Sequence, residues 1–139
     1  MGTQNSVSSQ DDKTNRGTIL VVDDSPTICK LVDIILKKRG FRVVSASNGL
    51  DALARINDGL PSMIFLDITM PRMDGYQLCK IIKANRETRD IPVIMLTGKD
   101  GLVDKVRGRM AGSTGYITKP FGPDTLVQAV EKYSNSKHS

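Results

Sequence analysis

Three carboxylates, one hydroxyl and one ammonium stand where apolar runs of the sequence end: Asp23, Asp24, Asp67, Thr97 and Lys119. Asp67 is the most unusual of the five, because it follows the apolar run 64–66 and precedes Ile68. Clustered carboxylates repel one another and raise their own pKa values unless a cation joins them. Oxygen ligands without nearby His or Cys favour a hard divalent ion, above all Mg²⁺.

A magnesium ion beside an ammonium and a hydroxyl is suited to a phosphoryl group. The two cations balance its charge, and the hydroxyl donates a hydrogen bond. The sequence has no glycine-rich phosphate loop, so side chains or a covalent bond must hold the group. A carboxylate can accept it covalently as an acyl phosphate. Polar residues are also ordinary where strands meet solvent, but this accounts for one or two of the five and poorly for Asp67.

The elements that must position these side chains alternate between strand and helix patterns. Strands are predicted at 18–22, 42–46, 63–68, 92–97 and 115–118. Helices are predicted from Pro26 to a stop at Gly40, over 49–57, 74–84 and 102–110, and from an Asp124 cap through Tyr133. Strict alternation indicates right-handed βαβ crossovers. The predicted fold is therefore α/β, a five-stranded parallel sheet of the doubly wound, flavodoxin-like (βα)5 type.

Two helices carry more detailed expectations. Ser25 is predicted to cap the first helix, with Pro26 at its first position. In the helix over 49–57, we expect Leu50, Leu53 and Ala54 to face inward. In an open parallel sheet the chemistry gathers at the carboxyl ends of the strands, which is where the five polar side chains stand.

Composition indicates a single soluble domain. The chain has 139 residues, of which 39% are hydrophobic and 25% charged, and we predict a domain over 17–134. The flanks 1–16 and 135–139 are polar and are expected to be disordered. No apolar run approaches the ~18 residues of a membrane span, so we expect no membrane insertion. The formal net charge of +5 is mostly scattered, and the densest cluster, over 37–42, is interpreted as a solvated face.

The two cysteines give no sign of a metal or redox site. Cys29 and Cys79 form no C-x-x-C motif and have no His nearby in sequence. Their predicted helices cover opposite faces of the sheet, which argues against a disulfide between them. A reducing cytoplasm is the expected location.

Four motifs in order then resemble the receiver domain of two-component response regulators, in the stand-alone form used in chemotaxis and twitching motility. They are ILVVDDSP at 19–26, FLDITMPRMDGY at 65–76, PVIMLTG at 92–98 and GYITKPF at 115–121. The resemblance covers essentially all of 17–134.

The resemblance implies a set of metal and phosphate ligands. Asp67 would be the phosphoacceptor. Asp24 and Asp67 would bind Mg²⁺ directly, together with the main-chain carbonyl of Thr69. Asp23 would act mostly through a metal-bound water.

The resemblance also implies roles for residues around the phosphoryl group. Thr97 would hydrogen-bond a phosphoryl oxygen and Lys119 would pair with it. Tyr116 matches an aromatic switch position whose ring turns inward when Thr97 moves. The bond between Lys119 and Pro120 matches one that is cis in the family. Thr69 and Lys99 match positions that tune dephosphorylation, and here they predict a slow loss of the phosphoryl group.

These roles predict a signalling switch that a histidine kinase phosphorylates. It would not be an enzyme beyond its own phosphotransfer and autodephosphorylation. Its output surface would be formed by 102–110, 115–118 and the last helix, and we expect a monomer or weak dimer with an unknown target protein. The alternative is a receiver module excised from a larger regulator or hybrid kinase.

Two further classes fit less well. A haloacid-dehalogenase-type phosphatase would need a second Asp where Thr69 stands. A nucleotide-binding Rossmann domain would need a glycine fingerprint in place of 23–26. Direct nucleic-acid binding has only the net charge in its favour, so we expect none.

Overall fold

The structure is a computed structural model that describes residues 16–68, 75–98, 109 and 111–138. Within these ranges the strands and helices alternate as the sequence predicts, except that β5 follows β4 with no described helix between them. The helix predicted over 102–110 lies outside the described residues, apart from Arg109.

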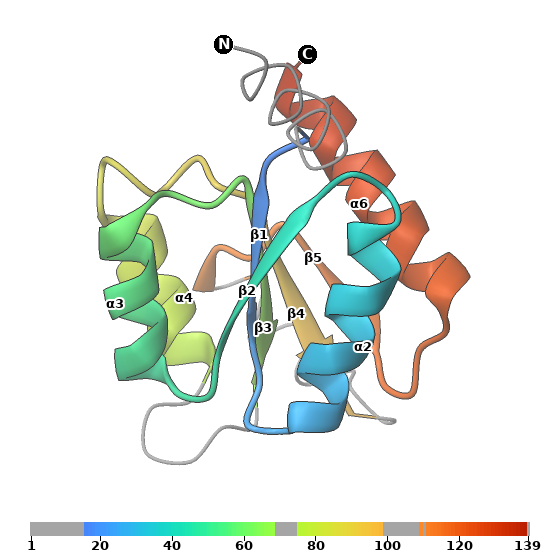
Figure 1. Cartoon of the computed structure of the whole chain (residues 1–139). Coiled ribbons are helices and arrows are strands. Elements are labelled where there is room, and N and C mark those ends of the chain that lie inside the picture. The colour runs from blue at the N-terminus through green and yellow to red at the C-terminus, as the bar shows by residue number, and fades with distance from the viewer. Residues whose placement is uncertain (1–15, 69–74, 99–108, 110, 139) are drawn as a thin grey trace, which may run out of the picture.

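Five parallel strands form one sheet in the order β2-β1-β3-β4-β5 (Figure 1). The strands are β1 (Thr18–Val22), β2 (Arg42–Ala46), β3 (Met63–Asp67), β4 (Val93–Thr97) and β5 (Gly115–Thr118). Every residue of β3 and β4 is buried, as expected for strands that are covered on both faces of the sheet. The doubly wound α/β fold is therefore confirmed.

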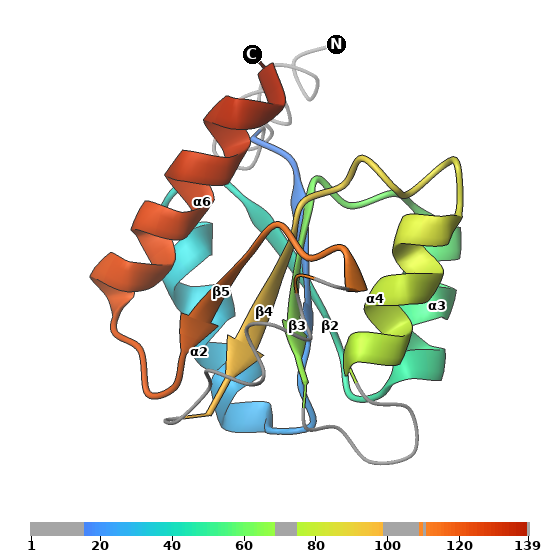
Figure 2. The ribbon, with the colours of Figure 1, turned by 180° about the vertical axis from the view of Figure 1, so that it is seen from behind.

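Among the described residues, two helices cover each face of the sheet. They are α2 (Pro26–Lys37), α3 (Gly49–Asp58), α4 (Gly75–Ala84) and α6 (Pro123–His138). Figures 1 and 2 show α2 and α6 on one side and α3 and α4 on the other. Each face has its own core, and the two thiols separate accordingly: Cys29 packs against the α2–α6 core and Cys79 is within the α3–α4 core. Both cysteines are free, as predicted.

The first helix begins and ends at the predicted signals. The Ser25 hydroxyl accepts a hydrogen bond from the Ile28 amide at 3.3 Å, and Pro26 opens the first turn. After the helix ends at Lys37, Gly40 adopts a φ of 92°, a left-handed conformation that glycine reaches without strain. This turn brings the chain back into β2.

The inward face predicted for α3 is wrong. Leu50 is 73% exposed and Ala54 is exposed, whereas Ala52 and Ile56 point into the core. Two neighbouring stripes of α3 are apolar, and periodicity alone does not choose between them. The helix has turned so that the small Ala52 lies against the sheet and the long Ile56 side chain is buried. Leu53 lies between the stripes and is half-buried.

The last helix is longer than predicted at both ends. It begins at Pro123, so Asp124 lies in its first turn instead of capping it. It continues to His138, five residues beyond the predicted end at Tyr133. Once a helix has formed, each added residue fixes few dihedrals and gains a hydrogen bond, so polar residues can continue it.

The cap of α3 gives a stability prediction. The Asn48 side-chain oxygen accepts a hydrogen bond from the Asp51 amide at 2.8 Å. We expect Asn48→Ala to lower the free energy of unfolding by about 1 kcal/mol, measured by urea denaturation. The matched control is Asn57→Ala, an exposed position inside the same helix, which should change the stability by less than about 0.5 kcal/mol. Equal losses in both variants would show that the cap does not anchor α3.

Candidate functional site

The five polar residues singled out in the sequence lie at one edge of the sheet. Asp23 follows β1, Asp67 ends β3, Thr97 ends β4 and Lys119 follows β5. This is the edge toward which the strand arrows point in Figures 1 and 2. Asp23, Asp67 and Thr97 are each no more than 2% exposed, which is unusual for polar side chains at strand ends.

The three carboxylates form a compact cluster. Asp23, Asp24 and Asp67 each offer one carboxylate oxygen, and these oxygens lie within 4.8 Å of one another. Asp23 and Asp67 are buried, whereas Asp24 is exposed. A set of oxygen donors, without His or Cys, suits a hard divalent cation such as Mg²⁺. The donor set therefore fits the ion that the sequence predicts.

Asp23 is held on both sides by the protein itself. Its Oδ1 accepts a hydrogen bond from the Ser25 amide at 2.9 Å, and its Oδ2 accepts one from Lys119 Nζ at 2.8 Å. Burial raises the pKa of Asp23, and the charge of Asp67 adds to this, against the lowering effect of the two hydrogen bonds. Because both oxygens already have donors, Asp23 is less available than Asp24 as a direct metal ligand.

Lys119 is the ammonium that connects the cluster. Its Nζ lies 3.6 Å from Asp67 Oδ2 in addition to its bond with Asp23. Burial pulls the pKa of Lys119 down, but the hydrogen bond and charge of Asp23 and the charge of Asp67 outweigh it, so the pKa is raised. Lys119 is therefore a cation at neutral pH. The peptide bond to Pro120 is cis, as the resemblance implies.

Thr97 and Tyr116 occupy neighbouring strands. The Thr97 hydroxyl lies 3.5 Å from the main-chain oxygen of Ile117, to which it donates a long hydrogen bond. Tyr116 is 46% exposed, so its ring is largely outside the core in this structure. The hydroxyl is thus close to the carboxylate edge but held by a weak bond that another acceptor could replace.

Gly75, at the start of α4, lies against the backbone of the acceptor strand. A Cβ atom at this position would lie 2.6 Å from both the Asp67 carbonyl oxygen and the Ile68 Cα. Only glycine lets the helix approach so closely. The start of α4 therefore packs directly against the backbone at the end of β3.

Two contributors to the site were not found from the sequence. The Ser25 amide bonds Asp23, and the Cys29 thiol lies 3.4 Å from the Asp23 carbonyl oxygen, to which it donates. The spacing of an Asp two residues before Ser is a pattern in which a side chain bonds the backbone, so it could have indicated the first contact. Thr69 and Lys99, predicted to tune dephosphorylation, lie outside the described residues, as does Asp74.

No helix among the described residues is both long and apolar enough to cross a membrane.

Comparison with known proteins gives matches in both sequence and fold. The signature of the response regulator receiver domain matches residues 19–131. Protein PilG of Pseudomonas aeruginosa is 50% identical over 115 residues, which are 83% of this chain and 85% of PilG. Longer transcriptional regulators also match, with 49% of their length covered.

Solved structures show the same fold. A putative response regulator from Chloroflexus aurantiacus is 34% identical, with a TM-score of 0.82 over 86% of this chain and 98% of its own. The chemotaxis response regulator CheY4 of Vibrio cholerae is 32% identical, with a TM-score of 0.79 over 84% of this chain and 97% of its own.

The carboxylate cluster predicts a particular effect of charge removal. Asp24 is exposed and forms no ion pair with another described residue, yet it lies close to two other carboxylates. Without Mg²⁺, Asp24→Asn should raise the free energy of unfolding by about 1 kcal/mol, the size expected for unit charges about 4 Å apart in a solvent-rich site.

With Mg²⁺ the parent should become more stable than Asp24→Asn. The ion stabilises the parent by binding its folded state, whereas the variant has lost one ligand. Urea denaturation with a chelator and with excess Mg²⁺ measures both effects. The control is Asp58→Asn, which removes an exposed carboxylate at the other end of the sheet. Its stability relative to the parent should be the same with a chelator and with excess Mg²⁺. Equal Mg²⁺ stabilisation of parent and Asp24→Asn would contradict a metal site here.

Proposed function

The chain belongs to the family of response regulator receiver domains, and from this premise we propose that it acts as a phosphorylation-activated switch in a two-component system. The observation that carries the proposal is the buried Asp67 carboxylate, which stands 3.6 Å from the Lys119 ammonium in a cluster of three carboxylates. A buried carboxylate with a cation on one side and metal-binding oxygens on the other is suited to accept a phosphoryl group.

The proposed reaction is phosphoryl transfer from a phosphohistidine of a histidine kinase. A carboxylate oxygen of Asp67 attacks phosphorus, the P–N bond breaks, and the imidazole leaves with the electron pair and takes up a proton. The product is an aspartyl phosphate. Mg²⁺, when bound by Asp24 and Asp67, supplies positive charge that offsets the carboxylates and the phosphoryl oxygens.

The other side chains would position the group instead of reacting. Lys119 is poised between Asp23 and Asp67 and can pair with a phosphoryl oxygen while it keeps one carboxylate partner. Thr97 can exchange its 3.5 Å bond to Ile117 for a bond to that group. Such positioning suits phosphoryl transfer, because its loose transition state leaves little covalent work for the protein.

The same pocket would admit water for hydrolysis, so the protein would catalyse only its own phosphorylation and dephosphorylation. The slow hydrolysis predicted from Thr69 and Lys99 rests on the sequence alone. The short Thr69 would orient water poorly, and the long cationic Lys99 could screen the phosphoryl group.

The proposed output is a change of surface. Movement of Thr97 toward a phosphoryl group would vacate space that the exposed Tyr116 ring could fill. Because the two residues lie on adjacent strands, the rearrangement would reach the surface formed by 102–110, β5 and α6, where a downstream protein would bind.

A receiver module of a longer regulator is the second candidate, since the chain also matches longer regulators of which the match covers 49%. Its phosphorylation chemistry would be the same, and the output would pass to another domain in place of a separate protein.

The acceptor assignment is tested by intact-mass measurement. Incubation with Mg²⁺ and a small acyl phosphate should add one phosphoryl group to the parent and none to Asp67→Asn. Asp33→Asn, a carboxylate on α2 outside the cluster, is the control and should be phosphorylated as the parent is. A hydroxylamine-labile mass increase that persists in Asp67→Asn would place the acceptor elsewhere.

The switch is tested at Thr97. We expect Thr97→Ala to accept a phosphoryl group but to lose the change at the surface, because no hydroxyl moves toward the phosphoryl oxygen. The readout is the fluorescence or ring NMR signal of Tyr116 with and without phosphorylation. Thr97→Ser keeps the hydroxyl and is expected to retain most of the response. A full Tyr116 response in Thr97→Ala would reject the coupling.

A further inference from the structure

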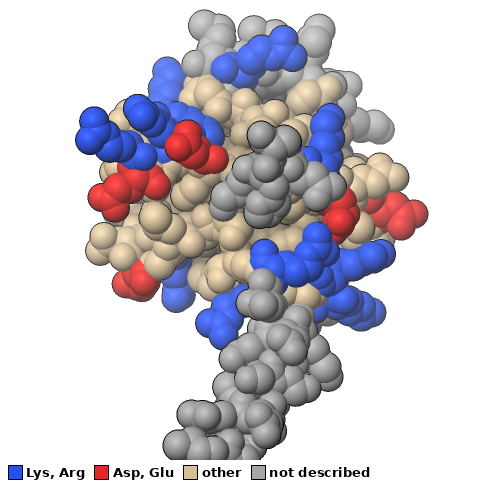
Figure 3. Space-filling view, turned by 90° about the horizontal axis from the view of Figure 1, so that it is seen from above, with Lys and Arg blue, Asp and Glu red and all other residues tan. Residues whose placement is uncertain are grey.

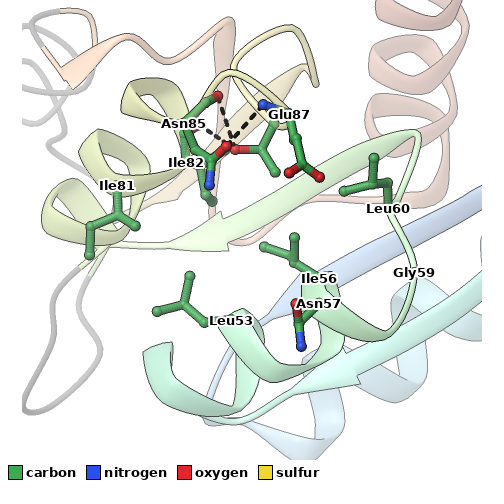
Figure 4. A pocket seen from close by; sticks show the side chains of 10 residues that line it. Leu53, Ile56, Asn57, Gly59, Leu60, Ile81, Ile82, Asn85 and Glu87 are labelled. Carbon is green, nitrogen blue, oxygen red and sulfur yellow. Dashed lines mark hydrogen bonds between the residues drawn. The ribbon is translucent and has the colours of Figure 1, made fainter.

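A groove lies between α3 and α4, at the end of the sheet opposite the carboxylate cluster (Figure 4). Its volume is about 280 Å³. Its apolar lining comes from both helices and the loop after α3: Leu53, Ile56, Leu60, Ile81 and Ile82. None of the residues assigned to the phosphorylation site lines it.

Exposed apolar side chains gather around this groove. Five large hydrophobic residues are exposed among the described residues, and three of them belong to the α3–α4 layer: Leu50, Leu60 and Ile81. Leu60 is 55% and Ile81 38% exposed, and both line the groove. Leu50 and Leu53 follow the i, i+3 spacing of one helix face, and Leu53 lines the groove. The stripe that α3 turns outward is thus the apolar one that sequence periodicity placed inside.

The wall on the α4 side is fixed by hydrogen bonds. The Thr88 hydroxyl donates to the Ile82 carbonyl at 2.5 Å, and the Glu87 amide donates to Asn85 Oδ1 at 2.9 Å. Lys83 Nζ donates to the carbonyls of Arg89 and Ile91 at 3.0 and 2.6 Å. A preformed wall of this kind needs little ordering when a partner binds, which favours affinity.

One charged residue lines the groove. Glu87 extends toward the open space in Figure 4 and has no ion-pair partner among the described residues. Asp58, the last residue of α3, likewise has no ion-pair partner among the described residues. The negative ends of the α3 and α4 dipoles point to this same end. Figure 3, which looks onto it, shows acidic side chains between groups of Lys and Arg. Arg86 and Arg89 are exposed nearby but do not line the groove.

We propose that the α3–α4 groove docks an amphipathic helix of another protein, with apolar residues at i, i+3 or i+4 and i+7 and a Lys or Arg that pairs with Glu87. The apolar residues of that helix would contact Leu53, Leu60 and Ile81. Its Lys or Arg would pair with the Glu87 carboxylate in the loop between α4 and β4. Helices laid into apolar grooves are a common mode of recognition, and their specificity comes from such flanking charges.

Other occupants fit less well. Residues 1–15 of this chain contain only Met1 and Val7 as large apolar residues, which do not match the groove's spacing. A second copy joined through the same face would bring two concave surfaces together, and these do not fill each other. Binding here is also independent of phosphorylation at Asp67, because the groove and the carboxylates lie at opposite ends of the sheet.

The test uses the full chain and synthetic helical peptides of about 14 residues, about four turns. Each peptide carries leucines at i, i+3, i+4 and i+7, and one end bears either Lys or Glu. Calorimetry gives affinity, and amide chemical shifts identify the surface. We expect the Lys peptide to bind the parent with shifts confined to α3, α4 and the loop 85–90. Leu60→Ser and Ile81→Ser should each weaken it about tenfold, because each removes an apolar anchor from the groove.

Two controls separate this site from general stickiness and from misfolding. Ile34→Ser removes a comparably exposed isoleucine from α2 and should leave affinity unchanged. Glu87→Lys should weaken the Lys peptide severalfold and strengthen the Glu peptide, a charge swap that an unfolded variant would not produce. Shifts outside the α3–α4 face, equal binding to parent and Ile81→Ser, or no binding of any peptide at ~1 mM would overturn the proposal. Sedimentation of the chain alone as a dimer that Ile81→Ser dissociates would assign the groove to a second copy instead.

Discussion

The site depends on one electrostatic constraint: among the described residues, three carboxylates, two of them buried, share one end of the sheet with a single ammonium. Asp23 would be costly to bury as an anion without Lys119 and the Ser25 amide, which together bond both of its oxygens. Asp67 lies farther from the same ammonium, with its Oδ2 at 3.6 Å from Lys119 Nζ. The cluster is therefore held together but not neutralised, and its remaining negative charge is what a divalent cation would balance.

The parallel sheet satisfies this constraint because it brings distant residues to one edge. Lys119 and Asp23 are 96 positions apart in the chain and 2.8 Å apart in space. The order β2-β1-β3-β4-β5 makes β1 and β3 neighbours, so their terminal carboxylates must be close. The Lys119 side chain, which follows β5, reaches past β4 to Asp67 and Asp23, and Gly75 lets α4 pack against the backbone of the acceptor strand. Each step follows from strand order and from the small size of one residue.

The strands and the position of the site were predictable because polar or charged residues follow the apolar runs of the strands. Continuous apolar runs located the strands, and the polar residues after them located the site. What the sequence left open was decided by tertiary contacts. The phase of α3 depended on how Ala52 and Ile56 fit the core, and the apolar count of its two faces was too even to predict this. The length of α6 depended on helix propagation, which polar composition does not forbid. The bonds of Asp23 depended on the orientation of its side chain.

A ligand at the carboxylate cluster and a ligand in the α3–α4 groove would affect a conformational switch differently. A ligand shifts a conformational equilibrium only by its differential affinity for the two states. A phosphoryl group would contact Thr97 and Lys119, whose partners it would change. A helix in the α3–α4 groove would contact residues whose hydrogen bonds are already complete in the described structure, such as Thr88 and Asn85. It would therefore bind both states about equally, and a partner bound there would not compete with the change at Thr97.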